Sequence, residues 1–231
     1  MSVSERARRG ALRVLSRVNV HPPTTVAGTT ARFVTLTPND AHRATHLEHE
    51  EDAALWLFDD IGPDDVFWDV GAHQGHWSII AARRGAIAIA FEPSESRTRI
   101  RENLSLNRLH GEVHIQAVVL TDRGGWVQMS PKGPSMMTVD PGGETRKAGI
   151  RGDDVEELAP DRLKIDVEGH ELHVLDGMPG RLAGVDRVLV EVHDPVEPAA
   201  VRERLEAAGL ETLEIDTPRS QPHIAGRRWS E

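Results

Sequence analysis

The sequence has no cysteine, no tyrosine and only three lysines among its 231 residues, namely Lys132, Lys147 and Lys164. Without cysteine, disulfide bonds, thiolate catalysis and cysteine-ligated zinc are excluded. The absence is compatible with a reducing cytoplasm, which is the location that we expect. The roughly 20 consecutive apolar residues of a membrane-spanning helix are also lacking. No signal peptide is apparent, because the basic start of the chain is followed by Pro22-Pro23 and threonines instead of an apolar stretch.

Positive charge is scarce as well. Asp and Glu number 37 against 27 for Lys and Arg, which gives a formal net charge of -10 at pH 7. Nucleic acid and anionic lipid both require a basic surface, so neither is expected as the main partner. A small-molecule or glycan acceptor is compatible with this charge. The acidic excess also suits a salt-rich cytoplasm, in which carboxylates keep a protein hydrated, and we hypothesise a halophilic source.

The most informative stretch is a predicted strand, loop and helix. Val66–Val70 has the apolar pattern of a buried strand, and His76–Ala82 has helical character. Gly71 and Gly75 fall in the loop between them, where glycine lets the backbone approach a ligand closely. The spacing lacks the middle glycine of the dinucleotide fingerprint G-x-G-x-x-G. A cofactor without pyrophosphate fits better, and we infer S-adenosylmethionine, with Asp69 as part of the site.

A carboxylate follows the next predicted strand. The apolar run Ala86–Phe91 ends in Glu92, which precedes Pro93. Glu92 lies about 20 residues beyond the glycine loop, the separation expected when one strand-helix-strand unit places a carboxylate on a ribose. Two rival interpretations share these features. One is a nicotinamide-dependent oxidoreductase, against which the missing glycine counts, and the other is a module that binds the cofactor without catalysis.

More acidic residues follow two further apolar strands. Asp166 and Glu168 come after one of them, and Glu191 and His193 end the other. Ligands of an open parallel sheet bind beyond the carboxyl ends of its strands. We therefore expect Asp166 on the same rim as the glycine loop and Glu92.

The acceptor decides which of these side chains take part in chemistry. A hydroxyl acceptor needs a base to remove its proton, and the candidates are Asp166, Glu168 and His193, the last with an ordinary pKa near neutrality. A carboxylate acceptor is already ionised and needs no base. We assign no metal ligands, although a divalent metal held by Asp166, Glu168, Glu191 or His193 is an alternative way to acidify a hydroxyl. Glu168 and Glu171 either bind substrate or solvate the turn.

Residues 1–60 are expected to form an extension of a cofactor-binding domain that spans 61–231. The first 20 or so residues carry five arginines and one glutamate, with apolar residues at helical spacing. Such a basic amphipathic helix can lie on a membrane surface or bind a partner, but packing on its own domain is commoner. A short strand is predicted over Thr29–Thr37.

A polar helix is predicted from a cap at Asp40 to about Asp60. His42, His46 and His49 recur on one of its faces. The pattern lacks H-E-x-x-H, so we interpret the three histidines as a solvated face in place of a metal site.

The remaining chain alternates strands and helices. A strand is predicted around Val113–Leu120, and the glycine- and proline-rich stretch Gly124–Pro141 is predicted as a hairpin or loop insertion that recognises substrate. Two strands, Leu213–Ile215 and Ile224–Trp229, end the chain and indicate an antiparallel edge to the sheet.

Taken together, four ordered motifs resemble the FkbM-family methyltransferases over roughly Asp60–Asp216. The matching runs are Asp69-Val70-Gly71-Ala72-His73-Gln74-Gly75, Phe91-Glu92-Pro93, Asn103-Leu104-Ser105-Leu106-Asn107 and Lys164-Ile165-Asp166-Val167-Glu168-Gly169-His170-Glu171, with Val190-Glu191-Val192-His193 downstream. His73 stands where the family usually has asparagine, and His170 where it has a small residue.

This resemblance implies an α/β fold, the class I methyltransferase Rossmann-like sheet, mostly parallel with an antiparallel edge strand and helices on both faces. It also implies S-adenosylmethionine-dependent O-methylation of a hydroxyl or carboxyl on a small molecule or glycan, such as a cell-envelope sugar. We expect the catalytic residues to be Asp166, Glu168 and His193. The cofactor-binding residues are expected to be Asp69, Gly71, His73, Gly75, Glu92 and Ala117.

Overall fold

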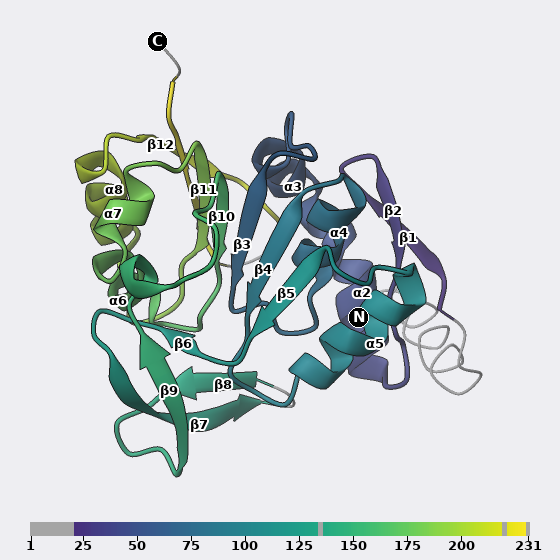
Figure 1. The fold of residues 1–231 in the computed structure, drawn as a ribbon, viewed down its shortest axis with the longest axis horizontal. Coiled ribbons are helices and arrows are strands. Elements are labelled where there is room, and N and C mark those ends of the chain that lie inside the picture. The colour runs from purple at the N-terminus through teal and green to yellow at the C-terminus, as the bar shows by residue number, and fades with distance from the viewer. Residues whose placement is uncertain (1–20, 134–135, 219–220, 230–231) are drawn as a thin grey trace.

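The computed structural model describes residues 21–133, 136–218 and 221–229. The basic helix predicted for residues 1–20 lies outside this part of the chain. A seven-stranded sheet forms the centre of the molecule (Figure 1), in the order β12-β13-β11-β10-β3-β4-β5. These strands span β3 Val66–Val70, β4 Ile87–Phe91, β5 Val113–Gln116, β10 Arg162–Ile165, β11 Arg187–Glu191, β12 Glu211–Ile215 and β13 His223–Arg227.

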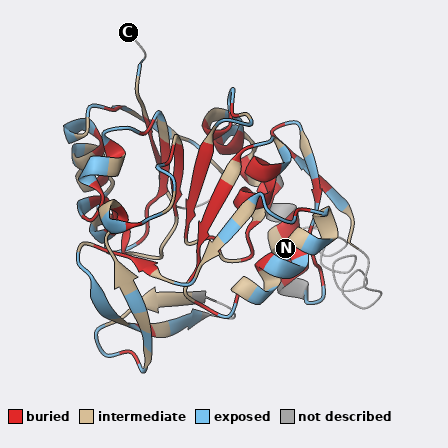
Figure 2. Cartoon of the chain, viewed as in Figure 1, coloured by how far each residue is buried: buried red, intermediate tan, exposed pale blue. Residues whose placement is uncertain are grey.

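The central sheet is mostly parallel, as predicted. β5, β4, β3, β10 and β11 pair in parallel, and β13 pairs antiparallel with both β11 and β12. The antiparallel pairing expected from the two C-terminal strands is therefore confirmed. The strand that reverses direction is β13, one position in from the edge strand β12. All five residues of β3 are buried, and Figure 2 shows the middle strands as the buried centre of the fold.

Helices cover both faces of the sheet, and alternate strand residues face two different cores. Phe67 packs in the core that contains α4 residues, whereas its neighbour Trp68 packs in the core that contains Leu175 and Leu205. The helices on the first side are α3 Glu51–Leu57, α4 His76–Arg83 and α5 Arg97–Asn107, and those on the second are α6 Glu171–Asp176, α7 Pro179–Leu182 and α8 Pro198–Ala207.

The described part of the extension, residues 21–60, packs on the first side. It begins with a hairpin of β1 (Pro23–Val26) and β2 (Thr29–Arg32), so the strand predicted over Thr29–Thr37 ends earlier. Val26 and Phe33 share one core with Phe67. This core contains residues from both sides of residue 60. The domain boundary expected at residue 60 stays a prediction.

The predicted polar helix was wrong in its start and its continuity. The cap is Thr37, whose hydroxyl accepts a hydrogen bond from the Asp40 amide, while the Asp40 carboxylate accepts one from the Thr37 amide. Asp40 is thus the third helical residue of a capping box, and Pro38 fixes the helical φ at the first position. The segment then divides into α2 Pro38–His46, a 3-10 turn Leu47–Glu50 and α3.

A second, four-stranded sheet has the order β6-β9-β7-β8, with β6 Val119–Leu120, β7 Gly125–Gly133, β8 Met136–Val139 and β9 Thr145–Ile150. The predicted hairpin is confirmed by the antiparallel pairing of β7 with β8. The single strand predicted over Val113–Leu120 was wrong, because β5 joins the central sheet while β6 pairs with β9. Within the described ranges, no helix is long and apolar enough to cross a membrane.

Candidate functional site

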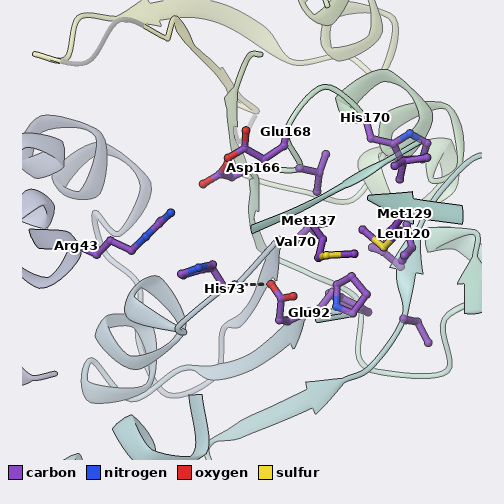
Figure 3. Close-up of a pocket in the computed structure, with 17 residues that line it drawn as sticks. Arg43, Val70, His73, Glu92, Leu120, Met129, Met137, Asp166, Glu168 and His170 are labelled. Atoms are coloured by element: carbon purple, nitrogen blue, oxygen red, sulfur yellow. Dashed lines mark hydrogen bonds between the residues drawn. The ribbon is translucent and has the colours of Figure 1, made fainter. Parts of the chain in front are cut away.

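A cavity opens where β3, β4 and β10 end and the second sheet meets them (Figure 3). Gly71, Glu92 and Asp166 line its central-sheet side. The second sheet contributes Met129, Met137 and Val139. The cavity therefore has a polar wall of loop backbone and carboxylates, and an apolar wall that can cover the flat face of a ring.

Glu92 is held rigidly at the edge of this cavity. Its side chain is 6% exposed, and its two carboxylate oxygens accept hydrogen bonds from the amides of His73 (2.8 Å) and Ser94 (2.7 Å). Burial raises the pKa of Glu92, and the hydrogen bonds from Ser94 and His73 act in the opposite direction. The remaining lone pairs of a fixed carboxylate suit hydroxyl donors.

The two loop glycines have different tasks. Gly71 has a φ of +85°, lines the cavity and leaves no room for a side chain against the backbone of Asp166. Gly75 has a φ of +74° and caps α4, and a Cβ there would meet Ile100 at 2.9 Å. Both need the conformational freedom of glycine, but Gly71 faces the cavity and Gly75 packs the helix.

A second cavity adjoins the first and shares Arg43, Gly71, His73 and Asp166 with it. Arg43 comes from α2 in the extension, and in Figure 3 its side chain points toward the carboxylates. The other titratable side chains that line the second cavity are His42, Glu50, Asp69, His76 and Lys164. It is a polar chamber with several basic groups, joined to the first cavity at the end of β3.

The buried Lys164 lies beside two aspartates, Asp69 of the second cavity and Asp166, which lines both cavities. Lys164 of β10 lies in register with Asp69 of β3 and is 2% exposed. Its Nζ donates to Asp166 Oδ2 at 2.8 Å. Burial opposes the charge of Lys164, but Asp166, Glu191 and Asp69 raise its pKa. Burial also raises the pKa of Asp69, which Lys164 partly offsets.

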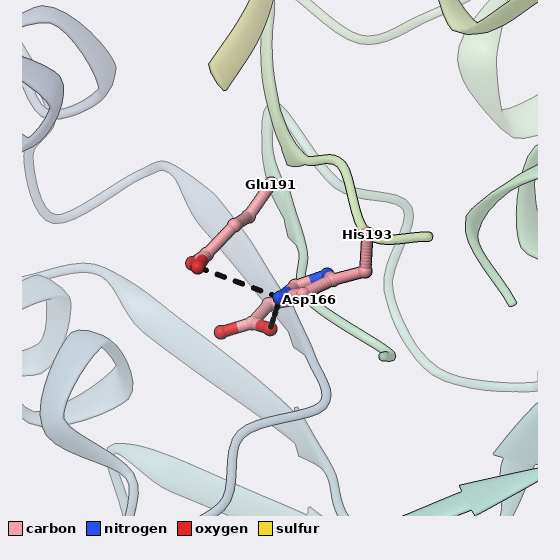
Figure 4. A group of neighbouring side chains, drawn as sticks. All are labelled: Asp166, Glu191 and His193. Carbon is pink, nitrogen blue, oxygen red and sulfur yellow. Dashed lines mark ion pairs between the residues drawn. The ribbon is translucent and has the colours of Figure 1, made fainter. Parts of the chain in front are cut away.

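His193 lies close to Asp166 in a group of carboxylates (Figure 4). Its Nδ1 is 2.9 Å from Glu171 Oε1, and its Nε2 is 3.5 Å from Glu191 Oε1 and 3.9 Å from Asp166 Oδ1 and Glu168 Oε2. Burial acts to lower the pKa of His193, but the bond to Glu171 and the nearby carboxylates outweigh it and raise that pKa to about 10. The group therefore attracts positive charge strongly.

The family model of the methyltransferase FkbM domain matches residues 69–211 of this chain. The chain belongs to the FkbM methyltransferase family. It is 32% identical over 216 residues to the hexuronic acid methyltransferase AglP of Haloferax volcanii, a match that covers 89% of this chain and 88% of that relative. The expected methyltransferase activity is confirmed, and the oxidoreductase interpretation was wrong.

Solved structures share the fold of this methyltransferase. Methyltransferase FkbM from Methylobacillus flagellatus superposes with a TM-score of 0.58 at 11% identity, over 95% of this chain. The chain spans 58% of the length of that protein. The ribosomal protein L11 methylase of Lactobacillus delbrueckii subsp. bulgaricus superposes with a TM-score of 0.52 at 17% identity, and the match covers 78% of this chain and 79% of that one.

The cofactor of this methyltransferase is S-adenosylmethionine, as predicted. The first cavity fits its chemistry. A buried carboxylate, Glu92, offers acceptors for ribose hydroxyls, and Phe91, Leu120 and Met129 offer apolar contact to a purine. Asp166 adds a second carboxylate to the lining of this cavity.

The predicted site residues divide into four groups. Gly71, His73, Glu92, Asp166 and Glu168 line the first cavity. Asp69 lines the second cavity, and His193 stands behind Asp166. Among the described residues that line either cavity, Gly75 and Ala117 do not occur; Ala117 is exposed, and its neighbours Val118, Val119 and Leu120 reach the first cavity in its place.

One of the two alternatives given for Glu171 was wrong: the residue is completely buried, accepts from the Gly169 amide and binds His193, so it does not solvate the turn. Other residues of the site were missed. Lys164 carried a signal in the sequence, because a lysine inside an apolar strand requires a carboxylate partner. Arg43 and Met137 carried none, since only the tertiary fold brings them to the cavity.

Proposed function

We propose that the chain methylates an oxygen of an acidic sugar, a hexuronic acid or a close relative, as part of a glycan. The observation that carries this acceptor is the second cavity, where the basic side chains of Arg43 and His42 line the same chamber as Asp166. Cationic side chains in a polar chamber suit a sugar carboxylate. The similarity to the hexuronic acid methyltransferase AglP supports the same acceptor class.

The first cavity is proposed to hold S-adenosylmethionine. When bound, the cofactor supplies an electrophilic methyl group, whose transfer breaks a carbon–sulfur bond, forms a carbon–oxygen bond and leaves a neutral thioether. Glu92 binds the ribose hydroxyls, and Gly71 and His73 lie along the amino acid part. Asp69 and Gly75 hold the loop and the start of α4, through the Asp69 bonds to Ser78. Ala117 stays a prediction as a cofactor-binding residue.

Asp166 and Glu168 are proposed to face the acceptor. If the acceptor atom is a hydroxyl oxygen, one of these carboxylates takes its proton, since Asp166 lines both cavities and Glu168 lines the first. His193 is less suited to that step, because it lines neither of the two cavities. A carboxyl acceptor needs none of this proton transfer.

The protein is further proposed to work in a salt-rich cytoplasm. The support is the net charge of -10 with three lysines, together with a relative from a halophile. Melting temperatures in dilute buffer and in molar KCl test this: a large rise with salt is expected, and an unchanged value contradicts it. Contact of the basic N-terminal helix with a membrane stays a prediction.

An acceptor comparison tests the proposed function. The purified chain is incubated with S-adenosylmethionine and matched pairs of glycosides, a glucuronide and the corresponding glucoside, and products are measured by mass spectrometry. Methylation of the glucuronide in clear preference to the glucoside is expected. Mild alkali then separates a methyl ester, which hydrolyses, from an ether, which survives. Equal or exclusive methylation of the neutral glucoside contradicts the acidic acceptor.

A further inference from the structure

We propose that Asp166, Glu191 and His193 form a binding site for one divalent transition-metal ion at the edge of the cofactor cavity. One potential ligand atom from each of these residues lies within 4.8 Å of the others. The residues come from different segments, the end of β10, the end of β11 and the loop after it (Figure 4). The sheet thus brings two carboxylates and one imidazole close together.

The distances inside the group are slightly longer than those of ligands around an ion. His193 Nε2 is 3.5 Å from Glu191 Oε1 and 3.9 Å from Asp166 Oδ1. Both exceed the usual 2.7 to 3.2 Å of a direct N–H···O hydrogen bond. Two atoms that each lie about 2.1 Å from one metal are separated by roughly 3 to 3.5 Å. All three ligand atoms lie within 4.8 Å of one another, so small side-chain movements would bring them to a common ion.

The imidazole is buried and aimed before any ion arrives. The His193 side chain is only 7% exposed. Its Nδ1 bonds to Glu171 Oε1, and Glu171 is itself completely buried and fixed by the Gly169 amide. A histidine that ligates a metal through one nitrogen almost always donates its other N–H to such a carboxylate, which fixes tautomer and ring direction. Glu171 is therefore the positioning residue of the site.

Asp166 connects the site to the reaction. Its Oδ2 accepts from Lys164, while its Oδ1 is the oxygen nearer His193 Nε2. The same aspartate lines both cavities. Of the three ligand residues, only Asp166 lines these cavities, so an ion on its Oδ1 would lie beside them.

The donor set indicates the kind of ion. One imidazole nitrogen with two carboxylates suits Mn²⁺, Fe²⁺ or Zn²⁺ better than Mg²⁺ or Ca²⁺, which prefer oxygen alone. The role that we infer for the ion rests on the proposed function: it neutralises carboxylates that would repel an acidic sugar, and it lowers the pKa of a ligated hydroxyl. Binding of the ion itself is independent of that role.

Mn²⁺ titration of the cofactor-free protein, stripped with chelator, tests the site by the loss of the free-ion EPR signal. One site per chain is expected. Glu191→Gln and His193→Gln should each weaken binding by at least about tenfold, as should Glu171→Gln by removing the bond that aims the imidazole. His114→Gln, at a half-exposed histidine paired with Glu157, should bind like the wild type. Equal binding by all variants, or none by the wild type, overturns the site.

A second readout does not depend on how the variants fold. Electron spin-echo modulation of the Mn²⁺-loaded wild-type protein should show the nitrogen coupling of one imidazole, and its absence overturns the assignment of His193. Neither measurement uses sugar. Methylation of glucuronides by protein that binds no Mn²⁺ refutes only the metal site, whereas Mn²⁺ binding without methylation of acidic sugars refutes only the proposed acceptor.

Discussion

Gly71 approaches the backbone of Asp166 so closely that a Cβ on Gly71 would lie 1.8 Å from the Asp166 carbonyl oxygen. The cofactor loop after β3 and the carboxylate end of β10 are thus in direct backbone contact. Parallel pairing of the two strands places these ends together, with Val70 opposite Ile165. The contact unites the loop and Asp166 in one site, and it makes the glycine a structural requirement as well as a surface for ligand.

Gly71→Ala is predicted to destabilise the fold by at least about 2 kcal/mol, because a side chain at a φ of +85° is strained and its Cβ collides with backbone. Urea unfolding measures this. Gly62→Ala is the matched control, since nothing lies within 4 Å of a Cβ at that position. Equal stability of the two variants would show that the loop and β10 are not in contact.

Glu92→Gln is predicted to weaken S-adenosylmethionine binding by about 1 to 3 kcal/mol, through loss of hydrogen bonds to a charged acceptor. Calorimetric titration of the cofactor and of its demethylated product measures the effect, and both should lose affinity alike. Glu95→Gln is the control, because Glu95 is exposed and outside the cofactor cavity. Wild-type affinity in the Glu92 variant refutes the ribose assignment.

Asp166→Asn is predicted to lower kcat by about 100-fold if the acceptor is a hydroxyl, with little change in the Kd of the cofactor. Single-turnover kinetics and calorimetry separate the two quantities. Asp176→Asn, at an exposed aspartate that pairs with Arg204, should turn over normally. A loss of affinity as large as the loss of rate would instead make Asp166 a cofactor-binding residue only.

His76 is predicted to make folding sensitive to mild acid. Burial, with the charges of His73 and Arg43, lowers its pKa from 6.5 to about 3. Because the pKa is lowered in the folded state, only the unfolded chain takes up the proton between pH 6.5 and pH 3. The stability that His76 contributes is therefore fully present above pH 6.5 and is lost as the pH falls toward 3. Between pH 7 and pH 5, the free energy of unfolding should therefore fall by about 2 kcal/mol less in His76→Gln than in the wild type. Urea unfolding at both pH values checks this, with the exposed His110→Gln as control.

The sheet and its rim were predictable because their signals are local. β3, β4 and β11 are buried on both faces, so they read as continuous apolar runs. Each run ends at a glycine or a carboxylate, and parallel topology then places Gly71 and Glu92 on one rim. The class of cofactor followed from the number and spacing of glycines in a single loop.

The rest of the site depends on contacts between distant segments. Arg43 reaches the cavities only because the extension folds back over α4, and no local pattern encodes that path. The bond between Glu171 and His193 joins a helix to a loop 22 positions later. The strand β9 completes the second sheet from a segment without strong alternation. Such features follow from packing, not from local propensity.

The most direct measurement is a crystal structure of the protein with S-adenosylmethionine. We predict that the ribose hydroxyls lie within hydrogen-bond distance of Glu92, that the sulfonium lies beside Asp166, and that the methyl group faces the chamber containing Arg43. A cofactor bound elsewhere, or one that contacts Glu92 while its sulfur points away from Asp166, contradicts the account.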